Sequence, residues 1–276
     1  MQPGSLPSLF GEKAMLVTDT WKKELEAAHK SAHAAGAILS KMYGHVNHVT
    51  KKGDIDLVTD ADLMSEQAIL EVIRHNFPGD NINSEESGKL GEKSNRTWLI
   101  DPLDGTTNFA HCFPFFAVSI ALEVSGRLVL GVVYNPYMDE YFEASEGAGA
   151  YLNNRRIEVS RTAELGEALL GTGFPYDIHD KPAEIIGLFG KMIIRAQGIR
   201  RPGAAALDLC YVAAGRLDGF WEQGLKPWDT AAGAVILKEA GGKLSSFGGA
   251  PYTPYMKSIL AANPLIHDLM LKLLKA

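Results

Sequence analysis

Residues 98–109, Trp-Leu-Ile-Asp-Pro-Leu-Asp-Gly-Thr-Thr-Asn-Phe, hold the side chains of this sequence that are best suited to chemistry. An apolar run ends abruptly in two carboxylates, Asp101 and Asp104, and a glycine and two threonines follow at once. A short hydrophobic run closed by Pro and Gly indicates a buried strand, and ligand-binding groups gather at the ends of such strands. Carboxylates attract a hard cation, while Gly-Thr-Thr offers N–H groups and hydroxyls that suit phosphate oxygens. The sequence therefore predicts phosphoryl chemistry at a strand end.

The same residues also have a simpler interpretation. Asp-Pro and Asp-Gly are common turn dipeptides, and Thr-Thr-Asn is suited to capping a helix. The complete string favours a site, because it resembles the Asp-Pro-Ile/Leu-Asp-Gly-Thr-Thr-Asn-Phe signature of the inositol monophosphatase family.

Further segments carry the same resemblance. Residues 83–87 (Asn-Ser-Glu-Glu-Ser) resemble the family's Gly-Glu-Glu-Ser, although Asn83-Ser84 replaces the usual lead-in. Residues 226–233 (Lys-Pro-Trp-Asp-Thr-Ala-Ala-Gly) resemble its Trp-Asp-x-Ala-Ala-Gly, and residues 56–62 and 203–209 match as well. The resemblance runs from about residue 20 to the C-terminus and is closest to the bacterial branch of the family.

The resemblance implies the layered α-β-α-β-α sugar-phosphatase fold, of mixed α+β and α/β character. An antiparallel N-terminal sheet and a mixed C-terminal sheet are expected, with the active site where the two halves meet. The implied activity is Mg²⁺-dependent, lithium-sensitive hydrolysis of myo-inositol 1-phosphate or a similar polyol or sugar phosphate. A cytoplasmic homodimer is expected by family analogy.

Carboxylates from four places in the chain make up the candidate metal site. Ionised carboxylates crowded into one pocket repel one another unless a cation compensates them. Oxygen ligands point to Mg²⁺ rather than zinc, and no His/Cys cluster competes. By resemblance, two or three Mg²⁺ ions are held: one by Glu85, Asp101 and the Leu103 carbonyl, one by Asp101, Asp104 and Asp229, and a weaker third by Glu85 with Glu86.

The resemblance also implies roles in catalysis and substrate binding. Glu85, Asp104 and Thr106 are the expected catalytic residues, with Thr106 hydrogen-bonded toward Glu85 to orient the attacking water. The amides of Gly105 and Thr106 would hold the phosphate, and a covalent phospho-enzyme is not needed. Asp229 has a simpler alternative, because it precedes an apolar helical run and would serve there as an N-cap.

The substrate alcohol would be recognised by Gly203, Ala205 and Glu222, alongside Asp229. Ala204 stands where the family usually has Ser or Thr, so a hydroxyl contact is missing and the preference for inositol is in question. Lys51 matches a loop lysine near the family's site, although a lysine in a polar loop is commonly just solvated.

Composition sets broad bounds on the function. The chain has 276 residues and a net charge of −6, which argues against a nucleic-acid-binding surface as its main function. Cys112 and Cys210 make no metal-ligand pattern, and both are expected to be buried thiols in a reducing, intracellular protein. Residues 1–18 lack the pattern of a signal peptide and are expected to be a flexible leader, and no run is long enough to span a bilayer.

Hydrophobic periodicity predicts the elements that position these residues. Helices are expected over 19–43 and from 60 to about 77, the second with Leu63, Leu70, Ile73 and Phe77 facing inward. Runs at 116–124, 128–134, 140–144 and 150–152 predict an antiparallel meander. Beyond residue 165, strands near 168–172, 198–201, 217–222, 243–246 and 258–262 alternate with helices near 182–196, 204–215, 229–240 and 264–275. These patterns predict subdomains at about 19–162 and 163–276.

Other functions remain open at this point. Members of the wider superfamily hydrolyse fructose 1,6-bisphosphate, 3′-phosphoadenosine 5′-phosphate, NADP or histidinol phosphate. A different class is a regulatory protein, because some bacterial relatives associate with the transcription machinery. The intact set of carboxylates favours catalysis, since a pure binding module has no need of it.

Overall fold

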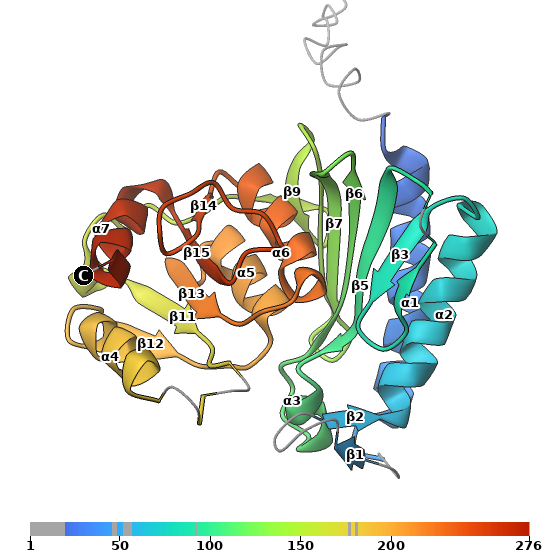
Figure 1. Ribbon diagram of the computed structural model, residues 1–276, viewed down its shortest axis with the longest axis horizontal. Coiled ribbons are helices and arrows are strands. Elements are labelled where there is room, and N and C mark those ends of the chain that lie inside the picture. Colours follow the sequence, from blue (N-terminus) through green and yellow to red (C-terminus); the bar gives the residue numbers. More distant parts are fainter. Residues whose placement is uncertain are drawn as a thin grey trace, which may run out of the picture.

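The computed structural model describes residues 20–45, 49–51, 57–91, 93–175, 178–179 and 182–275. Helices and sheets alternate in five layers (Figure 1). They are α1 (Lys22–Met42) with α2 (Asp60–Asn76), an eight-stranded sheet, α5 (Ala205–Ala213) with α6 (Pro227–Glu239), a five-stranded sheet, and α4 (Pro182–Ile193) with α7 (Pro264–Lys275). The predicted α-β-α-β-α order is confirmed. The predicted leader lies outside the described residues.

The eight-stranded sheet has the order β10-β9-β8-β7-β6-β5-β3-β4. Its strands are β3 (Asn81–Ser84), β4 (Gly88–Leu90), β5 (Arg96–Asp104), β6 (Ala117–Val124), β7 (Arg127–Asn135), β8 (Glu140–Ser145), β9 (Gly149–Leu152) and β10 (Arg155–Ile157). The predicted meander corresponds to β6 through β9. One correction applies: β3 runs parallel to β5, so the sheet is not purely antiparallel. This exception brings the carboxyl ends of two strands to the same edge.

Helices α1 and α2 cover one face of this sheet. The stripe predicted for α1 is buried, with Ala28, Ala32, Ala35 and Leu39 fully inaccessible. On α2 the predicted inward position of Leu63 is wrong, because its side chain is 52% exposed. The inward face of α2 instead combines apolar residues near its end with polar residues near its start, namely Asp62, Ser65 and Glu66.

The central helices α5 and α6 pack between the two sheets. Their small and apolar side chains, such as Ala206, Leu209 and Ala232, share one core with Leu99 of β5 and Phe220 of the second sheet. This core joins the two halves of the molecule.

The five-stranded sheet has the order β12-β11-β13-β15-β14. Its strands are β11 (Leu169–Thr172), β12 (Gly198–Arg200), β13 (Gly219–Gln223), β14 (Lys243–Ser245) and β15 (Ser258–Ala262). β11 is parallel to β12 and β13, and β15 is antiparallel to β13 and β14, so the predicted mixed sheet is confirmed. Helices α4 and α7 cover its outer face.

Short elements complete the fold. They are β1 (Val49–Lys51), β2 (Leu57–Thr59), α3 (Thr106–Ala110) and a 3₁₀ turn at Leu165–Glu167. Cys210 is buried as expected, but Cys112 is exposed, because it lies in a surface turn just after α3. In the described part of the chain, no helix is both long enough and apolar enough to cross a membrane.

Candidate active site

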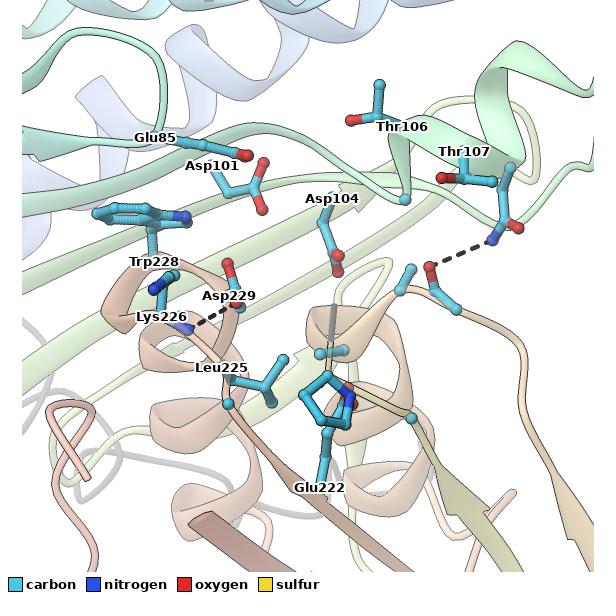
Figure 2. Close-up of a pocket in the computed structure, with 18 of the residues that line it drawn as sticks. Glu85, Asp101, Asp104, Thr106, Thr107, Glu222, Leu225, Lys226, Trp228 and Asp229 are labelled. Carbon is cyan, nitrogen blue, oxygen red and sulfur yellow. Dashed lines mark hydrogen bonds between the residues drawn. The ribbon is translucent and has the colours of Figure 1, made fainter. Parts of the chain in front are cut away.

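A cavity of about 390 Å³ opens where the two halves meet. Residues from β5 and the turn after β3 form one wall, and the starts of α5 and α6 with the end of β13 form the other. Figure 2 shows the carboxylates of Glu85, Asp101 and Asp229 directed into a shared space, with Asp104 beside them. The fold therefore brings together the four carboxylates that the sequence singled out.

Asp101 and Asp104 owe their positions to an irregularity in β5. The pairing of β5 with β6 shifts register between these two residues, and Pro102 between them cannot donate a backbone hydrogen bond. Both side chains are buried. The Leu103 N–H donates to Asp101 Oδ1 over 3.0 Å, and the Ala206 N–H at the start of α5 donates to Asp104 Oδ2 over 2.7 Å.

Glu85 reaches the cavity because β3 is parallel to β5. It follows the last residue of β3, and its backbone N–H donates to the Ile100 carbonyl over 3.1 Å. The sequence placed Glu85 and Asp101 in one site by resemblance alone, and the parallel pairing is the structural reason for their proximity.

Asp229 does not occupy the N-cap position. Helix α6 begins at Pro227 with Lys226 as its N-cap, which makes Asp229 the third residue of the helix. Its Oδ2 accepts a hydrogen bond from the Lys226 N–H over 2.7 Å. The simple N-cap interpretation of the sequence is thus corrected to a position in the first turn, where a carboxylate also suits the helix dipole.

The carboxylates raise one another's pKa. Burial is the main cause that raises the pKa of Asp101 well above its ordinary value, and Glu85, Asp104 and Asp229 raise it further. Burial also raises the pKa of Asp104, followed by the charge of Asp229. Within the described residues, neither Asp101 nor Asp104 forms an ion pair with a cationic side chain. Buried carboxylates without a cationic partner are stabilised by protonation or by bound cations.

The carboxylates fit Mg²⁺ by their chemistry. In the part of the chain that the structure describes, no three Asp, Glu, His or Cys side chains close around a single point. Mg²⁺ does not require such a cage, because it commonly takes one or two carboxylates and completes its octahedron with water and phosphate oxygens. Asp101 and Asp104 each give one oxygen to a backbone amide and still line the cavity.

The Thr106 hydroxyl has partners other than the expected Glu85. It lies 2.9 Å from Asp62 Oδ1 and 3.0 Å from the Leu103 carbonyl oxygen. Asp62 is itself buried on α2 and also accepts hydrogen bonds from Thr59. Gly105, just before Thr106, has φ +92°, and a Cβ there would lie 2.9 Å from the Phe115 carbonyl oxygen, so this turn favours glycine.

The opposite side of the cavity is formed by Glu222, Gly203, Ala204 and Ala205. Burial raises the pKa of Glu222 to about 8, although the charge of Arg201 acts in the opposite direction. A Cβ at position 173 would lie 2.0 Å from the Glu222 carboxylate, so glycine makes room for it. Lys51 lies in β1, but its side chain is outside the described residues.

Sequence reasoning gave no role to several residues that shape the cavity. Arg201 lines it with its guanidinium carbon 5.7 Å from the Phe174 ring centroid. Asn108 Nδ2 donates to the carbonyls of Phe115 and Pro202 over 2.7 and 2.9 Å, which ties α3 to the segment before α5. Asp62 and Glu66 lie on α2 behind the site, where Asp62 accepts from the Thr106 hydroxyl and Glu66 accepts from the amides of the turn after β3. Their spacing of four residues on a helix was the available signal, since it puts both on one face.

Comparisons with known proteins agree with this geometry. The model of the inositol monophosphatase family matches residues 21–276. An inositol-1-monophosphatase from Synechocystis is 47% identical over 251 residues, covering 90% of this chain and 86% of its own. The Nus factor SuhB of Escherichia coli is 43% identical over 250 residues, covering 90% and 94%. The structure of an inositol monophosphatase from Anabaena superposes with a TM-score of 0.86 at 43% identity, covering 93% and 97%.

Proposed function

This chain belongs to the inositol monophosphatase family and is a phosphatase, and from that premise we propose that it hydrolyses myo-inositol 1-phosphate or a similar polyol or sugar phosphate with Mg²⁺. The products are the free alcohol and inorganic phosphate. The proposal includes a homodimeric state and inhibition by Li⁺, by analogy with the family.

One observation carries the proposal: four carboxylates from separate segments line a single cavity. Burial and the charge of the neighbouring carboxylates raise the pKa of Asp101 and Asp104, so ionising all four together makes the cavity negative. A phosphate ester would be repelled from such a place without cations, and divalent cations reverse the local sign. The chemistry of the lining therefore supports a metal-dependent reaction of an anionic substrate.

The proposed ligand sets come from the family resemblance. The set of three carboxylates requires these side chains to draw together when the ion binds, because no three converge on one point in the described residues. Glu85, Asp101 and the Leu103 carbonyl would hold one ion, and Asp101, Asp104 and Asp229 a second. Glu85 with Glu86 would help to hold a third. When bound, Mg²⁺ would lower the pKa of a water molecule and offset the negative charge of the phosphate.

Thr106 would orient the attacking water. Its single hydroxyl hydrogen is directed to Asp62 or to the Leu103 carbonyl, so its oxygen is available to accept a hydrogen bond from that water. Gly105 and Thr106 line the cavity, and their amides would donate to the phosphate oxygens. A proton for the departing alkoxide would come from solvent, and no side chain forms a covalent intermediate.

The alcohol part of the substrate would lie against Glu222, Gly203 and Ala205. Ala204 is buried and lines the same cavity without a hydroxyl. A substrate hydroxyl that a Ser or Thr would contact in relatives must therefore find another partner here. This difference is the reason for including polyol and sugar phosphates other than myo-inositol 1-phosphate in the proposal.

A phosphate-release assay tests the proposal. The substrates are myo-inositol 1-phosphate, fructose 1,6-bisphosphate, 3′-phosphoadenosine 5′-phosphate, NADP and histidinol phosphate, each with Mg²⁺ or with EDTA. We expect fastest release from myo-inositol 1-phosphate, complete loss with EDTA, and inhibition by Li⁺. Fastest release from another member of the panel would make that compound the preferred substrate instead. Full activity after exhaustive chelation would exclude the metal mechanism.

A second candidate function is association with the transcription machinery. It is favoured by the name Nus factor SuhB carried by the 43% identical relative from Escherichia coli. Such a role would use the surface of the protein and would coexist with the cavity. Co-purification of RNA polymerase with the tagged protein from its own cells would support it, and a phosphatase that purifies without polymerase would contradict it.

A further inference from the structure

Glu66 is a buried carboxylate behind the active site that the proposed reaction leaves without a role. It lies on α2, and only 4% of its surface is exposed. Its Oε1 accepts hydrogen bonds from the Ser84 hydroxyl, from the Glu86 N–H over 3.2 Å and from the Ser87 N–H over 3.0 Å. Its Oε2 accepts the Ser87 hydroxyl. Four donors thus converge on one side chain.

These donors flank Glu85 on both sides. Residues 85–87 form the turn between β3 and β4, where Ser84 pairs with Gly88. A turn of this kind lacks ladder hydrogen bonds of its own, so its amides need other partners. Glu66 accepts from two of those amides, and the Glu85 N–H goes to the Ile100 carbonyl of β5. The backbone that carries Glu85 is therefore held from both directions.

Helix α2 offers a rigid base for these contacts. One residue before Glu66, the Ser65 hydroxyl donates to the Pro102 carbonyl over 2.8 Å, between Asp101 and Leu103. Farther along the helix, Ile69 and Ile73 are fully buried in the core against the sheet. Movement of α2 relative to the candidate metal ligands would break these contacts together.

We propose that Glu66 is a positioning residue that fixes the Glu85 turn in the geometry required for metal binding. The inference rests on the proposed function, since it assumes that Glu85 is a metal ligand. Glu66 itself would not touch the ion or the substrate. Groups that orient metal ligands from behind commonly change metal affinity by about 10- to 100-fold when they are removed.

A purely structural role would have a different signature. Loss of a buried, fully bonded carboxylate lowers the free energy of unfolding wherever it occurs. Positioning requires an additional loss of affinity for Mg²⁺ at temperatures where the protein is fully folded. Mg²⁺ binding to the free protein, measured by titration calorimetry, separates the two roles without relying on turnover.

The variants are Glu66→Ala, which removes all four acceptor contacts, and Glu66→Gln, which keeps Oε1 and removes the charge. In Glu66→Gln the new amide can donate to the Ser87 hydroxyl, so the turn stays held. Ile73→Ala is the matched control, because it weakens the same helix in the core. We expect about tenfold or greater weakening of Mg²⁺ binding in Glu66→Ala. Glu66→Gln and Ile73→Ala should stay within about threefold of the wild type.

Equal weakening in Glu66→Gln and Glu66→Ala would show an effect of charge and overturn the positioning role. Unchanged affinity in Glu66→Ala, or equal weakening in Ile73→Ala, would overturn it as well. If Glu66→Ala does not fold, Ser87→Ala at an exposed position provides the test. We expect its affinity for Mg²⁺ to fall by at least about threefold. An unchanged affinity would contradict the inference. A wild type that binds no Mg²⁺ would contradict the proposed function instead.

Discussion

At the scale of single residues, Asp229 allows charge to be separated from hydrogen bonding. In the wild type the Lys226 N–H donates to Asp229 Oδ2 over 2.7 Å. In Asp229→Asn the side-chain oxygen can still accept this hydrogen bond. The variant loses a favourable charge in the first turn of α6 and also loses repulsion with Asp101 and Asp104. We expect its melting temperature in EDTA to equal or slightly exceed that of the wild type. Turnover should fall by at least about 100-fold and the stabilisation by Mg²⁺ should shrink. If Asp229→Asn kept wild-type activity and Mg²⁺ dependence, Asp229 would only stabilise the helix.

Glu222 should act on substrate choice more than on the chemical step. It lies across the cavity from Glu85 and Asp101, and burial raises its pKa to about 8. Glu222→Gln should therefore raise KM unequally among polyol phosphates while kcat with the best substrate changes little. The pH dependence of kcat/KM near 8 should also flatten. These constants are measured for two substrates between pH 6.5 and 9. An equal drop in turnover for every substrate would contradict a recognition role.

At the scale of elements, periodicity located the long helices and strands well. Strand β15 and helix α7 were predicted at their observed limits, and the α1 stripe is buried as expected. The short strands β1, β2, β3, β4 and β10 were not predicted, because three or four residues are too few to establish a period, although β12 and β14, which are equally short, were found. On α2 the inward face was misjudged at Leu63, since the polar residues Asp62 and Glu66 point inward to serve the site. Hydrophobic periodicity assigns every polar residue to the solvent-facing side of a helix, including those that are buried.

The N-terminus of α5 has no side-chain cap, and one substitution should supply it. Ala204 is the N-cap residue, with extended backbone angles of φ −145° and ψ 100°, and it supplies no side-chain cap. In Ala204→Ser the hydroxyl can accept from the Leu207 N–H, while the Ala206 N–H continues to donate to Asp104. We expect the free energy of unfolding to rise by about 1 kcal/mol, measured by urea denaturation in EDTA. A destabilised variant would show that the buried position cannot satisfy the added hydroxyl.

At the scale of the whole molecule, the sequence motifs identified the residues of the site, whereas the fold determines which of them contact one another. Four distant carboxylates could be grouped from the sequence because the family resemblance links them. The partner of Thr106 could not be predicted, because Asp62 reaches it only through the packing of α2 against β5. Asn108 and Arg201 likewise gain their roles from the meeting of the two halves.

The clustered carboxylates also couple the stability of the whole protein to pH. Asp101, Asp104 and Glu222 all have raised pKa values, so between the unfolded and folded values the native protein binds protons that the unfolded chain has released. The free energy of unfolding then falls as pH rises, by at most about 1.4 kcal/mol per proton and pH unit. For Glu222 the window runs from 4.5 to about 8. The buried His267 acts in the opposite direction, but its lowered pKa confines that effect to pH below about 6.5.

Between pH 6.8 and 8.2 the carboxylates should therefore dominate. We expect the melting temperature in EDTA to fall across this range, and saturating Mg²⁺ to reduce or abolish the fall, because the ions replace protons as the compensating charge. Differential scanning calorimetry at the two pH values, with and without Mg²⁺, provides the measurement. Glu222→Gln should lessen the fall in EDTA, whereas Glu184→Gln on the exposed surface of α4 should leave it unchanged. A melting temperature in EDTA that rises with pH would mean that the raised pKa values of the cavity do not govern stability, and the negative potential on which the metal proposal rests would lose its support.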